Sequence, residues 1–418
     1  MYRKPIFIIL TLLLTAPSFA QLSIEACYAK AQANYPLIRQ HGLIEKSRDY
    51  NLSNAGKGYL PQVTFSAKAT YQSEVTEIPV SIPGVNVKGL SKDQYGASID
   101  INQVVWDGGS IRSKMENIRT STEMEAKSLE TDLYAINERV NQLFFGILLF
   151  DAQLVQNRLF QEELGRNYEK MISCVQNGIA NQADLDAVKV EQLKAIQAKS
   201  QLTHQKNAFL DMLSAMIGEP LNDNITLVKP SEISFADASI QRPELDLFNA
   251  KLKNLEAQNH EIKAGTMPKL GVFLTGGYAN PGLNMLKSGF SAYYIVGARL
   301  TWNFGNFYST QNNKLLIQNN INSVLTQQET FLFNANLDVS GRQREIDKYR
   351  DQMKYDDEII ALRTSVKQAS EAKMANGTLS GNDMMHDVYA EEVARQDKIL
   401  HEIVLLLAIY NLKFVTNN

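Results

Sequence analysis

The chain has 418 residues and a formal net charge of −3, and residues 1–20 contribute two of its 42 basic residues and none of its 45 acidic ones. Without them the charge is 40 − 45 = −5, which argues against a nucleic-acid-binding protein because such a protein needs a basic face. The length is enough for two or three ordinary domains or a single elongated one.

Residues 1–20 have the layout of a secretory signal peptide. Arg3 and Lys4 form a positive start, Ile6 to Ala16 is an apolar run too short to span a bilayer, and Ser18-Phe19-Ala20 is a small-x-small cleavage site. We therefore expect an exported bacterial protein whose mature chain starts at Gln21; the alternative is a retained N-terminal anchor.

The first repeat is expected to cover residues 21–217. It holds in order a helix, strands at about 61–75 and 93–106, a long helix, a turn at 177–183 and a second long helix. Apolar and polar residues alternate strictly from Val63 to Tyr71, which predicts a strand with two different faces. No proline occurs between residues 84 and 219, so the helical pattern from Gly109 to Asn177 predicts one helix without interruption.

Such long helices need coiled-coil partners, and the sequence offers two seams with seven-residue spacing. The apolar residues of the first seam are Val188, Ala195, Leu202, Phe209 and Met216. Those of the second are Val393, Leu400, Leu407 and Phe414. The apolar runs 143–150 and 403–410 are each too short to cross a membrane, and we expect them to be packed helix.

The second half of the chain repeats the landmarks of the first. After a linker at 218–242, rich in Pro, Asn, Asp and Ser, residues 243–418 are expected to form a helix, strands at about 268–279 and 290–304, a long helix, a turn at 376–382 and a last helix. Trp106 and Trp302 are the only two tryptophans, and each is followed three residues later by a glycine. The sequence thus predicts an internal twofold repeat.

All four predicted strands alternate and have a length of about ten residues, which is enough to cross an outer membrane when tilted. Aromatic residues near the strand ends are typical of membrane interfaces: Tyr59, Tyr71, Tyr95, Trp106, Tyr278, Tyr293, Trp302 and Phe304. A soluble sandwich with a buried face is the alternative. Four strands cannot close a barrel and open edges are not tolerated in lipid, so membrane strands require several chains, and three chains would give twelve strands. The apolar face would then touch lipid and the polar face would line a channel.

These features together resemble the TolC-like outer-membrane efflux proteins, the outer components of tripartite export systems. The resemblance covers residues 21–418 and rests on the strand entries at Pro61 and Pro268, the barrel exits from Trp106 to Gly109 and from Trp302 to Gly305, and two Asn-Gly turns. It implies a mainly α fold with transmembrane β: a homotrimer sharing a twelve-stranded barrel in outer-membrane lipid, with a long helical barrel in the periplasm. It also implies partners, namely a periplasmic adaptor protein and an inner-membrane pump.

The resemblance also locates a periplasmic gate beside the two turns, Asn177-Gly178 and Asn376-Gly377, which are expected to contact the adaptor. Asp184 and Asp383 each follow the turn glycine by six residues and would form rings of carboxylates at the entrance. The family often has a second acid three residues further on, where this chain has His386 followed by Asp387, so a pH-dependent gate is the alternative to the usual double acidic ring. The alternatives are a helix-capping role for both aspartates, and, for Asp383, His386 and Asp387, a solvated helix face or a metal site across the trimer axis.

No motif indicates an enzyme or a cofactor. The five histidines have no zinc-type spacing, and there is no phosphate-binding loop. Cys27 and Cys174 are expected to be free thiols because the predicted layout separates them by roughly 45 Å. The leading functional prediction is a passive channel for the efflux of small toxic compounds. The alternatives are the outer channel of a type I protein-secretion system and a soluble periplasmic coiled-coil scaffold.

Overall fold

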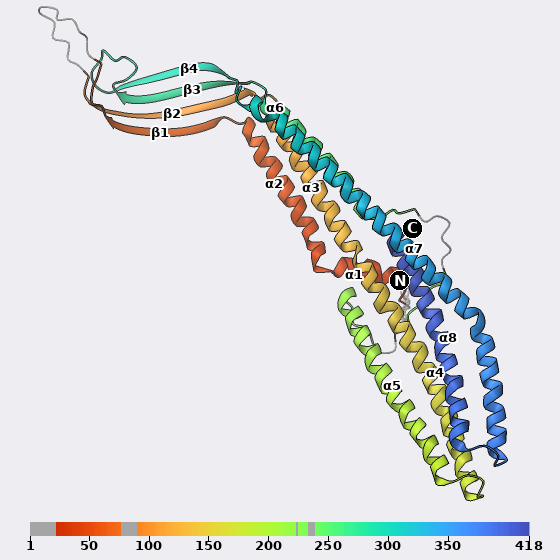
Figure 1. Cartoon of the computed structure of the whole chain (residues 1–418). Coiled ribbons are helices and arrows are strands. Elements are labelled where there is room, and N and C mark those ends of the chain that lie inside the picture. The colour runs from red at the N-terminus through yellow and green to blue at the C-terminus, as the bar shows by residue number, and fades with distance from the viewer. Residues whose placement is uncertain (1–21, 77–89, 223–224, 233–238, 418) are drawn as a thin grey trace, which may run out of the picture. The chain divides into compact units, whose positions relative to one another are not determined.

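The computed structural model describes residues 22–76, 90–222, 225–232 and 239–417 (Figure 1). The predicted signal peptide lies outside the described residues. The chain forms two compact units, and each unit is built from both repeats. Residues 1–38, 132–242 and 332–418 make the helical unit, and residues 39–131 and 243–331 make the unit that contains the sheet.

The helical unit is built mainly from four long helices. They are α4 (Ile136–Gln176), α5 (Gln182–Ile217), the second part of α7 (Asn306–Ala375) and α8 (Gly381–Thr416), and the shorter α1 (Ile24–Asn34) precedes a 3-10 turn, η1 (Pro36–Ile38). In Figure 1 α4 and α5 form one hairpin, and α7 and α8 form the other. As predicted from the absence of proline after residue 281, α7 is one continuous helix of 70 residues.

The main core of this unit lies where α1, α4, α5 and α8 meet. Phe144, Phe145 and Ile147 on α4 are almost fully buried, and they belong to the same cluster as Leu405 and Ile409 on α8. The segments Ser110–Gln176 and Gly381–Thr416 each contain a stretch apolar enough to cross a membrane by length and composition, and apolar residues within 143–148 and 403–412 of these segments pack in this cluster. The prediction that 143–150 and 403–410 are packed helix is confirmed.

Two helical predictions need correction. The helix predicted over 109–177 is interrupted: α3 (Ser110–Tyr134) ends one residue before α4 begins. Ala135 between them keeps helical dihedral angles, φ −58° and ψ −21°, so the interruption is local. The second predicted seam is wrong in its first half: Val393 and Leu400 are exposed, whereas Leu407 packs against the core and Phe414 stacks on Tyr134.

The other unit contains α2 (Arg39–Gly56), a 3-10 turn η2 (Lys57–Tyr59), most of α3, α6 (Pro243–Gly265), the first part of α7 and a four-stranded sheet. The strands are β1 (Gln62–Tyr71), β2 (Asp93–Trp106), β3 (Lys269–Asn280) and β4 (Ser291–Thr301). They are antiparallel, in the order β1-β2-β3-β4. All four strands occur where alternation predicted them, with ends that differ by a few residues, mainly in β1 and β4.

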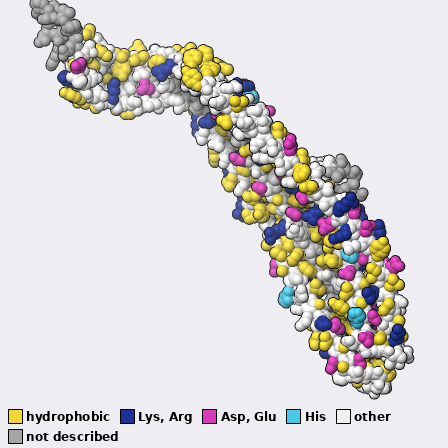
Figure 2. Space-filling view, viewed as in Figure 1, with side chains coloured by type: hydrophobic (Ala, Val, Ile, Leu, Met, Phe, Trp, Pro, Cys, Tyr) yellow, Lys and Arg dark blue, Asp and Glu magenta, His cyan; other side chains and the backbone are white. Residues whose placement is uncertain are grey.

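The register brings the apolar positions of all four strands onto one face of the sheet. Phe65 is opposite Ile99, and in the next pairs Ile101 is opposite Leu274 and Leu274 is opposite Val296. Because side chains alternate between faces, the whole alternating apolar set lies on the same side. Phe65 and Val296 are both 70 % exposed. Figure 2 shows charged side chains spread over the helices of the helical unit and only a few over the strands.

Candidate channel gate

The turn after α4 and the turn after α7 have the same backbone structure. Gly178 and Gly377 both adopt positive φ, 71° and 70°, a conformation that favours glycine at a helix C-terminus. In each turn the residue after the glycine donates its backbone N–H to the carbonyl five residues earlier, over 2.9 Å. The side-chain amides of Asn177 and Asn376 each donate to the carbonyl four residues earlier, over 2.8 and 2.9 Å. The two Asn-Gly motifs therefore build matching turns.

The two predicted gate aspartates both lie at the capped start of the helix that follows their turn. At the start of α5, Asp184 and Asn181 form a reciprocal capping box, in which each side chain accepts from the other's backbone N–H. At the start of α8, Asp383 donates its backbone N–H to Ser380 Oγ, and the Ser380 hydroxyl donates to the Asp383 carboxylate over 2.7 Å. A capped N-terminus satisfies backbone donors that the helix itself leaves unpaired.

Asp184 also links the two turns to each other. Its Oδ1 accepts the backbone N–H of Gly381 over 2.8 Å, and both residues are buried. A Cβ atom on Gly381 would lie 2.7 Å from Asp184 Cβ and 2.6 Å from Met171 Cε. Since contacts this short require something to shift, glycine at 381 is what allows the turns to approach so closely.

Asp383, His386 and Asp387 have different environments although they share one part of α8. Asp383 and His386 are exposed, whereas Asp387 is half-buried and accepts the Ser370 hydroxyl of α7 over 2.5 Å. His386 lines a groove of about 540 Å³ between α5 and α8. Among the described residues no group of three His, Cys, Asp or Glu side chains is arranged to hold a metal ion.

A buried ion network connects α4, α7 and α8 beyond the turns. Glu391 on α8 is only 2 % exposed and pairs with Lys367 on α7 and with Arg395 one turn along α8. Lys367 in turn pairs with Glu163 on α4 over 2.6 Å. Burial opposes ionisation of Glu391, but hydrogen bonds from Lys367, Thr364 and Arg395 outweigh it and lower the pKa of Glu391 to about 2. Glu391 is therefore an anion at any physiological pH.

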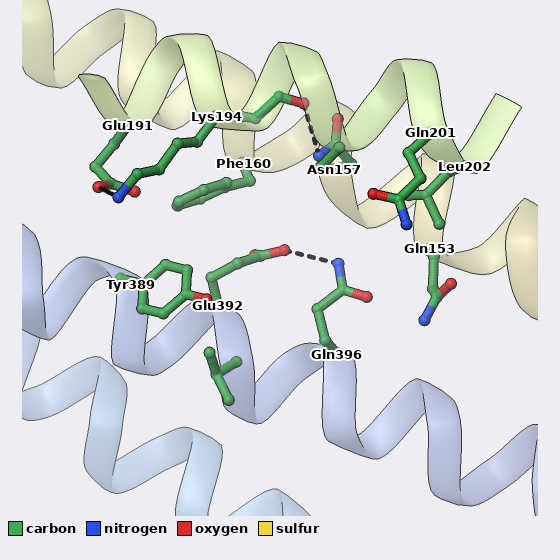
Figure 3. A pocket seen from close by; sticks show the side chains of 13 residues that line it. Gln153, Asn157, Phe160, Glu191, Lys194, Gln201, Leu202, Tyr389, Glu392 and Gln396 are labelled. Atoms are coloured by element: carbon green, nitrogen blue, oxygen red, sulfur yellow. Dashed lines mark hydrogen bonds and ion pairs between the residues drawn. The ribbon is translucent and has the colours of Figure 1, made fainter. Parts of the chain in front are cut away.

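The neighbouring acid, Glu392, lines a different space. It faces a cavity of about 440 Å³ between α4, α5 and α8, together with Phe160, Tyr389 and the Glu191–Lys194 pair (Figure 3). Its carboxylate accepts hydrogen bonds from Gln396 and Gln156 over 2.8 and 2.7 Å. Burial nevertheless raises the pKa of Glu392 above its ordinary value. Two adjacent acids on α8 thus have pKa values shifted in opposite directions.

The predicted junction residues occupy two matching connections between strand and helix. After Trp106, Asp107 accepts the N–H of Gly109 over 2.9 Å; after Trp302, Asn303 accepts the N–H of Gly305 over 3.0 Å. Trp302 Nε1 also donates to the Thr266 carbonyl over 3.0 Å. Pro61 and Pro268 each directly precede a strand.

Some residues of this site were not predicted from the sequence. The sequence analysis did not single out Gly381, Lys367 or Glu391, because the partners of Lys367 and Glu391 lie up to 204 residues away in the chain. Neither the charge nor its helical spacing distinguishes Glu391 from a solvated acid. Cys27 and Cys174 are free thiols in the structure, and they pack in or against different core clusters.

Comparison with known proteins gives a family match and several related folds. Residues 27–219 match the family model described as "Outer membrane efflux protein". Among solved structures, the fold is similar to the outer-membrane channel OprN, with TM-score 0.71 at 12 % identity, covering 94 % of this chain and 89 % of that one. It is also similar to CusC, with TM-score 0.71 at 13 % identity and coverage of 95 % and 92 %.

A third similar structure is the CmeC outer-membrane channel of Campylobacter jejuni, with TM-score 0.67 at 14 % identity, covering 94 % of this chain and 85 % of that one. At these identities the structural likeness shows the fold alone. Comparison of the sequence with curated proteins found no significant match.

The fold is that of outer-membrane channel proteins with long helices, and the first half of the chain carries the family match. Residues 27–219 thus match the outer membrane efflux protein family, and the chain has the TolC-like fold. The similar structures OprN and CmeC are both outer-membrane channels.

Proposed function

We propose that three copies of this chain form one channel through which small toxic compounds leave the cell passively. The observation that carries the proposal is the sheet. Its apolar face is continuous across four strands, and among the described strands β1 and β4 each pair with a single neighbour. Unpaired backbone groups are too costly in lipid to remain at an edge. Pairing of β4 with β1 of the next copy removes both edges, and three copies close a barrel of twelve strands.

The periplasmic entrance of the proposed channel lies at the two turns. Asp383 and His386 are exposed beside the second turn, and three copies would bring these groups around one axis. A ring of carboxylates favours cations and repels anions, and a nearby imidazole makes such a ring sensitive to pH between about 5 and 8. Asp184, with its carboxylate bonded to both turns, positions the entrance and does not line it.

The turns are also the proposed contact for partners. Asn177-Gly178 and Asn376-Gly377 are exposed at the ends of two hairpins, so an adaptor protein could contact both turns at once. The adaptor would in turn connect the channel to an inner-membrane pump that supplies energy and selects the substrate. This assignment follows from the family and from the exposure of the turns.

Native mass spectrometry of the detergent-extracted protein tests the proposed assembly. We expect extraction to require detergent and the main species to have three times the mass of the mature chain. A monomer recovered from the soluble periplasmic fraction would overturn the proposal and favour a soluble scaffold. Co-purification of the wild type, but not a variant with both turn glycines replaced by valine, with a periplasmic adaptor would support the partner assignment.

A further inference from the structure

Four of the five charged residues within the sheet lie on one face. Register and alternation place Lys68, Asp100, Lys269 and Arg299 opposite to the apolar face, on the side that also carries Thr64 and Thr275. Between Val63 and Leu300 the described strand positions of the apolar face carry no charge, apart from Asp93 at the end of β2. In the proposed barrel, which this inference presupposes, these four side chains face the lumen.

The register also assigns three of these charges to separate levels along the strands. Residues paired across neighbouring strands form rows across the sheet. Lys68 lies in the row of Gly96, Ala279 and Ser291, and Asp100 lies in the row of Thr275 and Ile295. Arg299 is opposite Gly271. On β4 these levels are positions 291, 295 and 299, four residues apart. At about 3.3 Å per residue, successive levels are separated by roughly 13 Å. A basic level therefore lies on each side of an acidic one.

The side chains at these levels are held differently. The Arg299 guanidinium lies over the ring of Phe273, 4.9 Å from its centroid, which keeps the cation against the sheet. Asp100 accepts the Thr275 hydroxyl over 2.5 Å and the Ser98 hydroxyl over 3.3 Å. Within the described part of the chain no ion pair neutralises Lys68, Lys269, Arg299 or Asp100. Each chain thus contributes three basic charges and one acidic charge to this face.

We propose that Lys68, Lys269 and Arg299 form cationic rings in the barrel and make it selective for anionic solutes, such as small compounds carrying carboxylate, sulfonate or phosphate groups. Rings of charged side chains set selectivity in pores. The barrel would then prefer the opposite charge from the acidic entrance at Asp383. A solute with both an acidic and a basic group would be attracted at each end of the path by a different group.

The test is the reversal potential of single channels in a gradient of KCl, measured near 0.01 M salt, where the screening length is about 30 Å. We expect Arg299→Gln and Lys68→Gln each to shift the reversal potential towards that of potassium, and Asp100→Asn to shift it towards that of chloride. Lys287→Gln removes an exposed charge from the loop between β3 and β4 and should cause a smaller shift than Lys68→Gln or Arg299→Gln.

A second readout addresses larger anions. Inorganic pyrophosphate should reduce the wild-type current more strongly than that of the Lys68→Gln, Arg299→Gln double variant. Conductance steps with a reversal potential that none of these substitutions changes would overturn the inference while leaving the channel in place. The absence of steps from the wild type would overturn the proposed channel and this inference together. Native mass spectrometry of each variant checks that it has assembled.

Discussion

Asp184 shows how one side chain can combine two structural tasks. Its two oxygens accept from Asn181 at its own helix start and from Gly381 at the other hairpin. The sequence indicates the capping role, because an acid three residues after Asn is a capping signal. It does not indicate the second bond, which joins residues 197 positions apart.

Replacing Asp184 with Ala should loosen the two turns. The change removes the capping box and leaves the buried N–H of Gly381 without its acceptor, a loss of about 1–3 kcal/mol. We expect faster amide hydrogen exchange in residues 376–384. Asp186→Ala, which removes an exposed acid from the same helix, is the control. Unchanged exchange at Gly381 in Asp184→Ala would contradict the proposed link.

Gly381→Ala should perturb the contact between Asp184 and Gly381 by changing Gly381 instead of Asp184. The added Cβ would overlap Met171 and Asp184, so the turns must separate, and overpacking of this kind costs about 1–3 kcal/mol. The expected result is a lower thermal unfolding midpoint and faster exchange at both turns. Gly341→Ala on α7 has open space around it and should not lower the midpoint. Equal midpoints for the two variants would mean that the close approach is unimportant.

Glu391 and Glu392 should respond to acid in opposite ways. The pKa of Glu391 is about 2 in the folded protein against an ordinary value of 4.5, so its contribution to stability is present above pH 4.5 and is lost as the pH falls towards 2. The pKa of Glu392 is raised by burial, so its ionised form opposes folding and protonation relieves that cost.

Substitutions of these two acids by Gln separate the effects. Glu391→Gln should lower the unfolding midpoint at pH 7 and weaken its decline between pH 4.5 and pH 3. Glu392→Gln should leave the midpoint at pH 7 unchanged or raise it. Thermal scans of detergent-solubilised protein across this pH range measure both. A larger loss at pH 7 from Glu392→Gln than from Glu391→Gln would contradict the assigned environments.

The strands and the long helices differ in how far the sequence predicts them. Alternation gives the strands directly, and the register then follows from keeping Phe65, Ile99, Leu274 and Val296 on one face. Helix packing is less determined, because several stripes of a long helix carry apolar residues. Val393 and Leu400 have the spacing of a seam but are exposed, whereas the charged residue Glu391 is buried on the same helix.

A pair of substitutions on β4 tests which face of the sheet meets lipid. Val296 lies on the apolar face and Ile295 on the opposite one. Arginine facing lipid near the middle of a bilayer costs about 2–4 kcal/mol. Val296→Arg should therefore reduce the amount of assembled protein in the outer membrane, and Ile295→Arg should reduce it much less. Equal yields from the two variants would contradict the assignment of faces.

In the proposed channel three chains close the barrel, because the four-stranded sheet of one chain has two edges. In the proposed trimer a neighbouring copy covers the two strand edges, and lipid covers the apolar face of the sheet. The order of landmarks in the sequence predicts the repeat and the family, and the family match over residues 27–219 supports this reading. The chemistry of the transported compound is less determined, because a lumen contributes only a few charged side chains.

Single-channel recording of the purified, detergent-extracted protein in a planar bilayer tests the channel most directly, with wild type and Asp383→Ala compared at the same salt concentration. We expect defined conductance steps from both proteins, with a weaker preference for cations at the entrance of Asp383→Ala. If Asp383→Ala changes neither the conductance steps nor the ion preference, the chain still forms a channel but its gate does not lie at Asp383. Complete absence of steps from wild-type protein that assembles as a trimer would contradict the proposal that this chain forms a channel.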